Sequence, residues 1–519
     1  MTIQLARARR GPRLVPAVLA AAALLLSGCA GTVEGNSNSS GGPPVHGGVL
    51  RTSAVDPGGG IDPVTAASPG AIGIVDIVAE KLVRVDADFK PAPVLATGWS
   101  ASGDGLSWRV PIRPGVTFNN GKPLVPEDVV ATFNRITAPD STSPAKGSFK
   151  GLLTSVRAEG GDVVFTLAKP FSDFPFLLAG SNTQILPADY RVGTWTENHV
   201  GTGAFRVKDF QPGQGVLFEK NQNYWNKDEI YLDGIETKFY GDQQARVLAL
   251  QSGEIDGLYG EPVPASLTSA LDGSQYTVDS VPAAGFSAFV LRADQAPFDD
   301  VKVRQAIAWA LDREAISKTV YGGQAALGND TVYGPTYSVR PTDLEQRKPN
   351  AAKVRELLGD RKVSFTITTS STEESHALLI QQQLKQLPNF DVQVDIQPGE
   401  KYYADGDTSP WLSAPATITY WASRPSPSQY NDFIYRTGAT WNASRYSNPE
   451  LDKLSDEYDR TTDAARRQEI VNRIGAIQWN DVPVIVSSYG NARRYLSKKV
   501  HLRQSAGVVD YTGAWLEKS

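Results

Sequence analysis

The chain has 519 residues, of which 41% are hydrophobic and 21% are charged, and its formal net charge is −5. This length predicts two or three domains, because a single hydrophobic core rarely organises so many residues. The composition is typical of a globular protein. The small acidic balance excludes a general nucleic-acid binder, which would carry a basic excess.

The N-terminus has the pattern of an export signal. Residues 1–13 contain four arginines and no acidic residue, and an apolar run follows at Leu14–Leu26. This run is too short to span a membrane comfortably, so we expect a signal peptide over residues 1–28. It ends in Leu26-Ser27-Gly28-Cys29, which resembles the lipobox of bacterial lipoproteins. We therefore expect lipidation of Cys29 and a flexible tether over residues 29–48, which would anchor the exported protein to the outer face of the cell membrane.

Strand-like and helix-like segments then alternate to the C-terminus, which predicts an α/β fold. Alternating and β-branched runs predict strands at Val49–Ala54, Trp108–Ile112, Val116–Phe118, Val163–Leu167, Gly215–Glu219, Ala416–Tyr420 and Val484–Ser488. Apolar residues at helical spacing predict helices at Ile72–Val83, Pro126–Ile136, Lys302–Thr319 and Asp463–Trp479.

Three local features refine this pattern. Asn120-Gly121 predicts a hairpin turn after Val116–Phe118. Asp299 or Asp300 can cap the helix at Lys302–Thr319, and we interpret Arg304 within it as an interdomain or capping cation. The helix at Asp463–Trp479 is predicted to carry an arginine-rich outer face.

The motifs of common enzymes are missing. The four histidines are not spaced as metal ligands on a helix, and neither an H-E-x-x-H motif nor a G-x-S-x-G elbow occurs. Cys29 is the single cysteine, which excludes an intrachain disulfide and a cysteine-based zinc site. We therefore expect a protein that is not an enzyme and that has no catalytic residue, no metal and no cofactor.

Eight short motifs resemble those of one family, and they occur in the family's order. They are Leu82-Val83 to Trp99, Leu106 to Phe118, Asn120 to Val129, Gly201-Thr202-Gly203-Ala204-Phe205 with Asn221 to Trp225, Ser252-Gly253-Glu254-Ile255-Asp256, Val303-Arg304-Gln305-Ala306-Ile307, Asp312-Arg313-Glu314 and Tyr446-Ser447-Asn448-Pro449-Glu450. The family comprises the extracytoplasmic solute-binding proteins of ABC importers, family 5, whose members carry dipeptides, oligopeptides and nickel complexes. The motifs extend over nearly all of the chain after the tether.

The resemblance implies a two-lobed α/β fold of the periplasmic-binding-protein type II, with an extra subdomain and a hinge between the lobes. On this sequence it implies the following division: lobe I at 49–90, 201–284 and 487–519, the extra subdomain at 91–200, and lobe II at 285–486. It also implies ABC permease and ATPase subunits as partners and a solute that binds between the lobes. We expect a monomer that meets the membrane only through its lipid anchor and binds no nucleic acid.

The segment Thr419–Tyr430 departs from the family pattern. Peptide-binding members carry an aspartate here that pairs with the ammonium of the peptide, whereas this chain has Arg424 at that place. Because a guanidinium matches a carboxylate or a phosphate, Arg424 is predicted to recognise an acidic group of the ligand, as in glutathione-binding relatives. The alternative is an internal ion pair of Arg424 with Glu373, Glu374 or Asp432.

Further ligand-binding candidates surround this segment. Aromatic residues in loops rich in proline, glycine and serine have less core to join, so we expect some of them to line the ligand cleft. The candidates are Trp421, Tyr420, Trp411 and Trp441. In lobe I the position in the family, together with its donor and acceptor groups, makes Asn182 a candidate.

Two other functions remain open at this stage. The aromatic residues also suit an oligosaccharide, and Arg424 also suits a metal chelate that carries carboxylates. A third reading, from another class, is an envelope lipoprotein with a structural or regulatory role and no part in transport.

Overall fold

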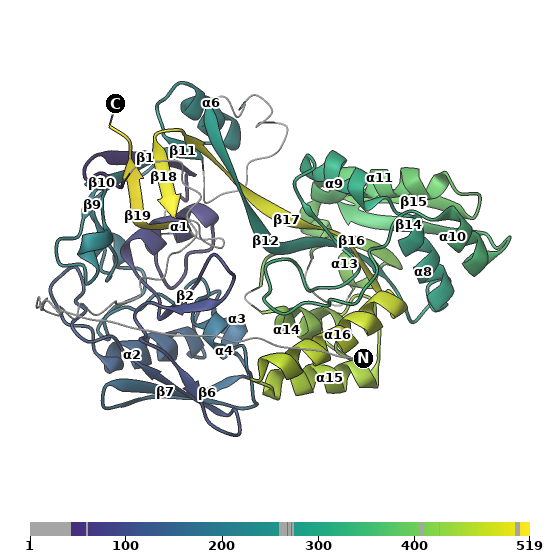
Figure 1. The fold of residues 1–519 in the computed structure, drawn as a ribbon, viewed down its shortest axis with the longest axis horizontal. Helices are drawn as coiled ribbons and strands as arrows, with labels where there is room; N and C mark the ends of the chain where they lie inside the picture. The colour runs from purple at the N-terminus through teal and green to yellow at the C-terminus, as the bar shows by residue number, and fades with distance from the viewer. Residues whose placement is uncertain are drawn as a thin grey trace, which may run out of the picture. The chain divides into compact units, whose positions relative to one another are not determined.

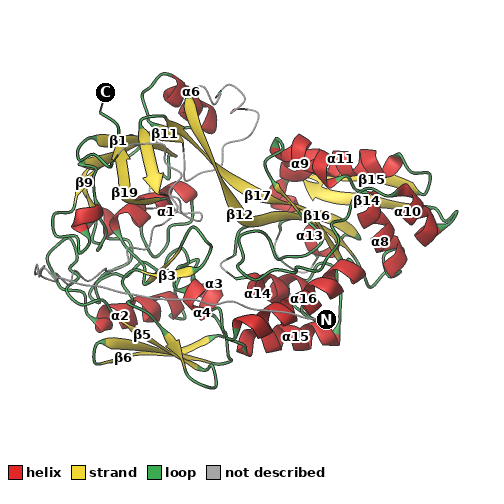
Figure 2. Cartoon of the chain, viewed as in Figure 1, coloured by secondary structure: helices red, strands yellow, loops and turns green. Residues whose placement is uncertain are grey.

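The computed structural model describes residues 43–519, except 59–60, 259–266, 268–270, 272–274, 405, 407, 425, 504–508 and 519. The predicted signal peptide, Cys29 and most of the tether lie outside the described residues. Figures 1 and 2 show the arrangement of helices and strands. Three larger sheets organise the described chain, and two strand pairs, β2–β3 (Val83–Val85 with Pro91–Pro93) and β18–β19 (Val500–Arg503 with Asp510–Leu516), accompany them.

The first sheet has the strand order β1-β10-β9-β8. Its strands are β1 (Val49–Val55), β10 (Gly234–Tyr240), β9 (Gly215–Lys220) and β8 (Phe205–Gln211). β1 runs parallel to β10, and the other pairs are antiparallel. Helix α1 (Pro69–Val78) contacts β8, and α6 (Gln243–Gln251) contacts β1. The predicted strands at Val49–Ala54 and Gly215–Glu219 are thus confirmed.

The second sheet has the order β4-β5-β7-β6 and lies within residues 91–200. Its strands are β4 (Ser100–Ala101), β5 (Ser107–Pro111), β7 (Asp162–Leu167) and β6 (Leu153–Glu159). Helix α2 (Pro126–Thr137) packs on β6 and β7 through Val129, Phe133 and Ile136, which are spaced at helical intervals. The short helices α3 (Lys146–Phe149), α4 (Phe174–Leu177) and α5 (Trp195–Asn198) follow in the same stretch of chain.

The third sheet has seven strands, of which six form the path β11-β17-β12-β16-β14-β15. They are β11 (Gly257–Leu258), β17 (Val484–Ser497), β12 (Tyr276–Leu291), β16 (Ala416–Trp421), β14 (Val363–Ser370) and β15 (Phe390–Gln397), with β13 (Ala326–Leu327) paired to β17. The long strands β12 and β17 pair along most of their length and are seen side by side in Figure 1. Tyr495 packs in one core with Leu250, whereas Val486 packs in another with Ile470, so β17 connects two separate hydrophobic cores.

Alternation along the strands of the third sheet divides its core into two layers. In β12, Phe286, Ala288 and Val290 join one cluster, whereas Phe289 and Leu291 join the other. The first cluster includes residues of α15 (Pro449–Arg460) and α16 (Ala464–Asp481) and of the short elements α13 (Pro410–Ser413), α14 (Pro427–Tyr430) and η3 (Asn431–Tyr435). The second includes residues of α8 (Val301–Ala310), α9 (Arg313–Tyr321), α10 (Ala351–Leu358) and α11 (Glu374–Lys385). Both faces of the sheet are therefore covered by helices.

Three predicted elements are corrected. The helix expected at Lys302–Thr319 is two helices, because Asp312 leaves the helical conformation and its side chain accepts the amide of Ala315 at 2.9 Å. The helix expected at Ile72–Val83 ends at Val78, and Val83 begins β2. The strand expected at Val116–Phe118 is reduced to a single bridge between Thr117 and Pro123, although Gly121 makes the predicted turn with φ +85°.

Two details of the predicted helices are confirmed. Asp300 caps α8 by accepting the amide of Lys302 at 2.9 Å. Arg304 lies 5% exposed and donates to the carbonyl of Asp481 at 2.7 Å, so it caps the C-terminus of α16.

The division into lobes at residues 90, 200, 284 and 486 stays a prediction. The second sheet lies inside the predicted extra subdomain, and β14, β15 and β16 lie inside lobe II.

A buried ion triad in lobe II provides a test of its stability. Asp330 is fully buried and lies 2.7 Å from the guanidinium of Arg313, and it also pairs with Arg347; both arginine side chains are 1% exposed. We predict that D330N lowers the free energy of unfolding by about 3–5 kcal/mol, because two buried cations lose their counter-ion. Asparagine tolerates the φ of +60° at this position, so the substitution keeps the backbone while it removes the charge and one hydrogen-bond acceptor. Urea denaturation measures the effect.

The control is D189N, which breaks an ion pair on the exposed surface and should change the free energy of unfolding little. An equally small change in both variants would contradict the prediction.

Candidate functional site

The carboxyl ends of two parallel strands meet at one edge of the lobe II sheet. Thr369 of β14 lies beside Ile418 of β16, and the strands end nearby at Ser370 and Trp421. The segments 370–374 and 420–430 therefore begin next to each other, and we call them together the carboxyl edge. In open α/β sheets, ligands bind outside the carboxyl ends of the strands. This edge is thus the place in lobe II where ligand contacts are expected on physical grounds.

Three of the predicted tryptophans form one aromatic cluster at the carboxyl edge. The ring centroid of Trp421 lies 6.4 Å from that of Trp411 and 6.0 Å from that of Trp441. Trp421 is buried, Trp411 is half-buried, and Trp441 is 38% exposed. The indole nitrogen of Trp421 is buried and has no hydrogen-bond partner among the described residues. The cluster runs from the core to the surface, and its inner end has one unused donor.

Tyr420 points to the opposite face of the strand from Trp421. It lies directly opposite Ser287 of β12 and is 52% exposed. A side chain at Gly285 would meet the tyrosine hydroxyl, since a β-carbon placed there would lie 2.7 Å from the phenol oxygen. The hydroxyl end of Tyr420 is therefore crowded while its ring remains open.

The backbone of Arg424 is held by two tyrosines. Its carbonyl accepts the hydroxyl of Tyr337 at 2.9 Å, and its amide donates to the hydroxyl oxygen of Tyr430 at 3.1 Å. The guanidinium lies 5.4 Å from the ring centroid of Phe433, and the Nε atom is buried without a partner among the described residues. Within the described chain no carboxylate lies within 4.0 Å of this guanidinium. The site thus holds a cation that lacks a counter-ion in the part of the chain that the structure describes.

The internal partners considered for Arg424 are engaged elsewhere or lie apart. Asp432 pairs with Arg436 at 2.7 Å and with Lys169 at 3.4 Å. Glu373 contacts His376 at 3.4 Å. Glu374 is exposed and makes no ion pair within the residues described. None of the three acids neutralises Arg424 in this structure.

Asn182 lies away from these residues, in a buried turn. It is 4% exposed, and its amide nitrogen donates to the carbonyls of Pro63 at 2.9 Å and Ala66 at 3.0 Å. Its φ of +61° is one that asparagine adopts more readily than most residues. Both donors of the side chain are used to hold the chain near residue 63, so we do not include Asn182 in the proposed site.

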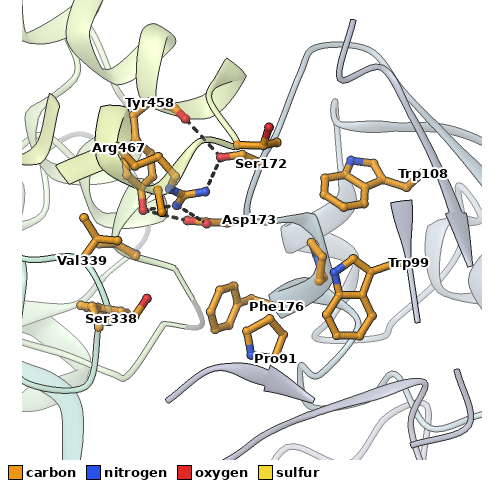
Figure 3. A pocket seen from close by; sticks show the side chains of 15 residues that line it. Pro91, Trp99, Trp108, Ser172, Asp173, Phe176, Ser338, Val339, Tyr458 and Arg467 are labelled. Carbon is orange, nitrogen blue, oxygen red and sulfur yellow. Dashed lines mark hydrogen bonds and ion pairs between the residues drawn. The ribbon is translucent and has the colours of Figure 1, made fainter. Parts of the chain in front are cut away.

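The segment that follows Arg424 is attached to the predicted extra subdomain. Ser426 donates to the carboxylate of Asp173, the residue that precedes α4, and Arg467 of α16 also binds this carboxylate. Ser172 donates its amide to the carbonyl of Asp459 at 2.7 Å and accepts Arg467 at 2.7 Å through its hydroxyl. Figure 3 shows the contacts of Arg467 with Ser172 and Asp173. Arg467 therefore points inward, because its charge is required by the buried Asp173. The other two arginines of α16, Arg466 and Arg473, are exposed, as predicted for its outer face.

A pocket of about 320 Å³ lies beside this contact. One wall carries Pro91, Trp99, Trp108 and Phe176, and the other carries Ser338, Val339 and Tyr458, as Figure 3 shows. Pro427 and Tyr337 also line it. The pocket thus lies between residues of the predicted subdomain and residues of lobe II, next to the segment that carries Arg424. Sequence reasoning missed Asp173 and Arg467, because no motif links two residues 294 positions apart.

Within the described residues no group of three or more His, Cys, Asp or Glu side chains is arranged to hold a metal ion. In the same part of the chain, no helix has the length and hydropathy that a membrane span requires.

Comparison with known proteins decides the family. Residues 90–442 match the model of the bacterial extracellular solute-binding proteins, family 5. The chain belongs to this family. As a family member, it has the two-lobed periplasmic-binding-protein fold and is a solute-binding protein.

Individual relatives of this solute-binding protein are distant. The chain is 25% identical to the dipeptide-binding protein DppE of Bacillus subtilis, over 85% of this chain and 87% of the relative. It is 27% identical to the glutathione-binding protein GsiB of Pectobacterium atrosepticum, over 82% and 85%. The solved structure of the murein tripeptide-binding protein MppA in its unliganded open form has a TM-score of 0.80, with 18% identity over 92% of this chain and 98% of the other. Because MppA is only 18% identical to this chain, the similarity of the two structures shows the fold alone.

The contact between the subdomain and lobe II contains an acid that titrates near neutrality. Asp459 is 4% exposed, accepts the hydroxyl of Ser428, and lies 3.9 Å from the ammonium of Lys169. Burial raises the pKa of Asp459 to about 7, and the carboxylate of Asp432 contributes to this increase. Nearby positive charge thus compensates the ionised carboxylate of Asp459 only weakly in the solute-binding protein.

We predict that stability falls as the pH rises from about 4 to about 7. The folded protein holds the proton of Asp459 more tightly than the unfolded chain, where the pKa of aspartate is about 4. The stabilisation is therefore complete below pH 4 and is lost as the pH passes through about 7, with a loss of roughly 2–4 kcal/mol at most. Urea unfolding between pH 4 and pH 8 measures the slope. In D459N the unfolding free energy should depend less on pH. If D459N keeps the slope of the native protein, the slope arises from other titrating groups.

Proposed function

We propose that the protein is the substrate-binding component of an ABC importer and that it captures a peptide or peptide-like solute with an acidic group. Family membership supports the transport role, since relatives that match over most of their length are named as dipeptide-, glutathione- and oligopeptide-binding proteins. In this role the protein would deliver its ligand to the permease and ATPase subunits as a single chain.

The guanidinium of Arg424, which has no acidic partner among the described residues, is the observation that carries the acidic ligand. A cation without an acidic partner costs free energy when it is removed from water, and an incoming carboxylate would remove this cost while making two parallel hydrogen bonds. The ring of Phe433 lies 5.4 Å from the guanidinium and contacts it without neutralising its charge. Trp421 and Trp441 provide apolar surface next to it for the rest of the ligand.

An oligosaccharide or a metal chelate is the second candidate for the ligand. The cluster of Trp411, Trp421 and Trp441 favours a sugar, because sugar rings pack on aromatic faces. A chelate that carries carboxylates would use Arg424 as a peptide does. A non-transport role in the envelope is the proposal that follows if no solute binds at all.

A thermal-shift screen followed by calorimetry tests the ligand class. Glutathione, short acidic peptides, oligosaccharides and nickel chelates are the probes, and a ligand at 100 times its dissociation constant adds about 2.7 kcal/mol of stability. For an acidic ligand, we predict that R424A weakens binding by about 2–5 kcal/mol, because a desolvated charge loses its partner. R424K should retain part of the affinity, since it keeps the charge and loses the bidentate geometry.

The control for this experiment is R157A, which changes an exposed arginine of the predicted extra subdomain and should leave the affinity unchanged. Unchanged affinity in R424A would contradict the acidic ligand. A strong response to neutral oligosaccharides alone would favour the second candidate, and the absence of any response would favour the envelope role.

We further propose that Cys29 carries the lipid anchor. Two or more acyl chains on one residue suffice for stable membrane attachment, and the motif Leu26-Ser27-Gly28-Cys29 supports this assignment. We predict that C29S releases the protein from the membrane fraction, as measured by fractionation of cells that express the full chain. S27A, which keeps the cysteine and a small residue beside it, is the control. Retention of C29S in the membrane fraction would exclude the anchor.

A further inference from the structure

A second charged group of the carboxyl edge has no function assigned so far. β14 ends at Ser370, the short helix η2 covers Ser371–Glu373, and α11 begins at the next residue. Glu373 is 9% exposed, and one oxygen of its carboxylate lies 3.4 Å from Nδ1 of His376. Among the described residues the other oxygen, Oε1, receives no hydrogen bond. This carboxylate is therefore mostly removed from water, and only one of its two oxygens has a hydrogen-bond partner among the described residues.

His376 meets Glu373 as a hydrogen-bonding partner. His376 is 1% exposed, and its Nε2 lies 3.2 Å from the hydroxyl of Ser487 in β17. A neutral ring satisfies both contacts, with the serine donating to Nε2 and Nδ1 donating to the carboxylate. No lysine or arginine of the described chain lies within 4.0 Å of Glu373. The start of α11 contributes only about half a positive charge, so negative charge remains.

The chain from Ser487 through His376 to Glu373 has the order of a hydrolase triad, but it is not positioned for catalysis. Ser487 is 2% exposed and lies within β17, so its hydroxyl is closed to a substrate. A nucleophilic serine must instead be reachable by the group that it attacks. We interpret the chain as a support that fixes the orientation of the carboxylate of Glu373.

Two partly exposed tyrosines lie near Glu373, because η2 contacts β16, which carries Tyr420, and α12 (Gly399–Tyr402), which precedes Tyr403, contacts β14. Tyr403 is 41% exposed and Tyr420 is 52% exposed. Burial raises the pKa of the crowded Tyr420 hydroxyl, and the carboxylate of Glu373 raises it further. Burial likewise raises the pKa of Tyr403, with a contribution from Glu373. Aromatic faces next to a carboxylate are the chemistry that binds an organic cation.

The sheet places this acid and the cation Arg424 on the two sides of one strand end. Tyr420 shares its face of the sheet with Ser287, whose hydroxyl contacts that of Tyr321 at 3.1 Å, and this is the face covered by α9 and α11. Trp421 points to the other face, toward the cluster that includes Trp441. A ligand that spans the end of β16 would therefore meet opposite charges at its two ends.

We propose that Glu373, with Tyr403 and Tyr420, binds an ammonium group of the solute while Arg424 binds its carboxylate. The ligand class is then a zwitterionic peptide or amino-acid derivative with its charges separated by several bonds. This inference rests on the proposed function for the role of Arg424. The role of Glu373 stands on its own contacts and can be tested independently.

Isothermal calorimetry with matched peptides tests the inference. The probes are glutathione and acidic di- and tripeptides, each as the free peptide, the N-acetylated peptide and the C-amidated peptide, together with spermidine and choline as cations without a carboxylate. For the native protein we expect N-acetylation to weaken binding at least tenfold. In E373Q the free and acetylated forms should bind within twofold of each other, while amidation still weakens binding. E374Q, which changes the exposed neighbour, should behave as the native protein.

Different outcomes separate the two proposals. Equal binding of free and acetylated peptides to the native protein, or full affinity in a folded E373Q, overturns the role of Glu373 and leaves that of Arg424 standing. A penalty for acetylation without any penalty for amidation or for R424A overturns the acidic-group proposal and supports Glu373. Binding of spermidine or choline that is lost in E373Q supports the role of Glu373, whatever the outcome for Arg424. If no probe binds the native protein, both proposals are wrong.

Discussion

The parallel pairing of β14 with β16 is the constraint on which the proposed site depends. Three register pairs, from Ile367 with Ala416 to Thr369 with Ile418, fix the two strands side by side. Since neighbouring strands lie about 4.8 Å apart, the segments that leave their carboxyl ends must start next to each other, although they are separated by some fifty residues of sequence. Alternation along β16 then sends Tyr420 and Trp421 to opposite faces. One hydrogen-bonded ladder thereby brings a carboxylate, a guanidinium and several aromatic rings to a single edge.

Some charged groups around this edge are paired within the protein, and others are not. Asp173 is buried and receives a full cation from Arg467 together with the hydroxyl of Ser426, so its charge is compensated within the protein. Among the described residues, Arg424 has no acidic partner within 4.0 Å, and Glu373 has no lysine or arginine within that distance. A compensated charge holds the chain in place, whereas an uncompensated one gains most from a ligand of opposite charge. The compensated group also bonds to Ser426, two residues after Arg424, so the position of the proposed binding loop depends on the contact with the predicted extra subdomain.

Strong local signals explain the successful part of the sequence prediction. Val129, Phe133 and Ile136 repeat at helical spacing, and α2 forms where they occur. Asp463 and Asp300 cap the helices that follow them, because a cap needs only the next two or three amides. The error at Lys302–Thr319 has the same origin, since Asp312 is itself a good capping residue within an apolar repeat, and its capping preference prevailed over the repeat.

By itself, the sequence determined the family, the α/β class and the unusual arginine, because these depend on residue type and on order along the chain. Tertiary structure alone decided that Asn182 holds a buried turn, that Arg467 points inward to Asp173, and that Arg424 has no acidic partner within reach in the described chain. It also brought Glu373 to the same edge as Arg424. Such contacts join positions far apart in sequence and leave no periodic trace, because a side chain pairs with whatever charge the folded backbone brings within a few ångströms.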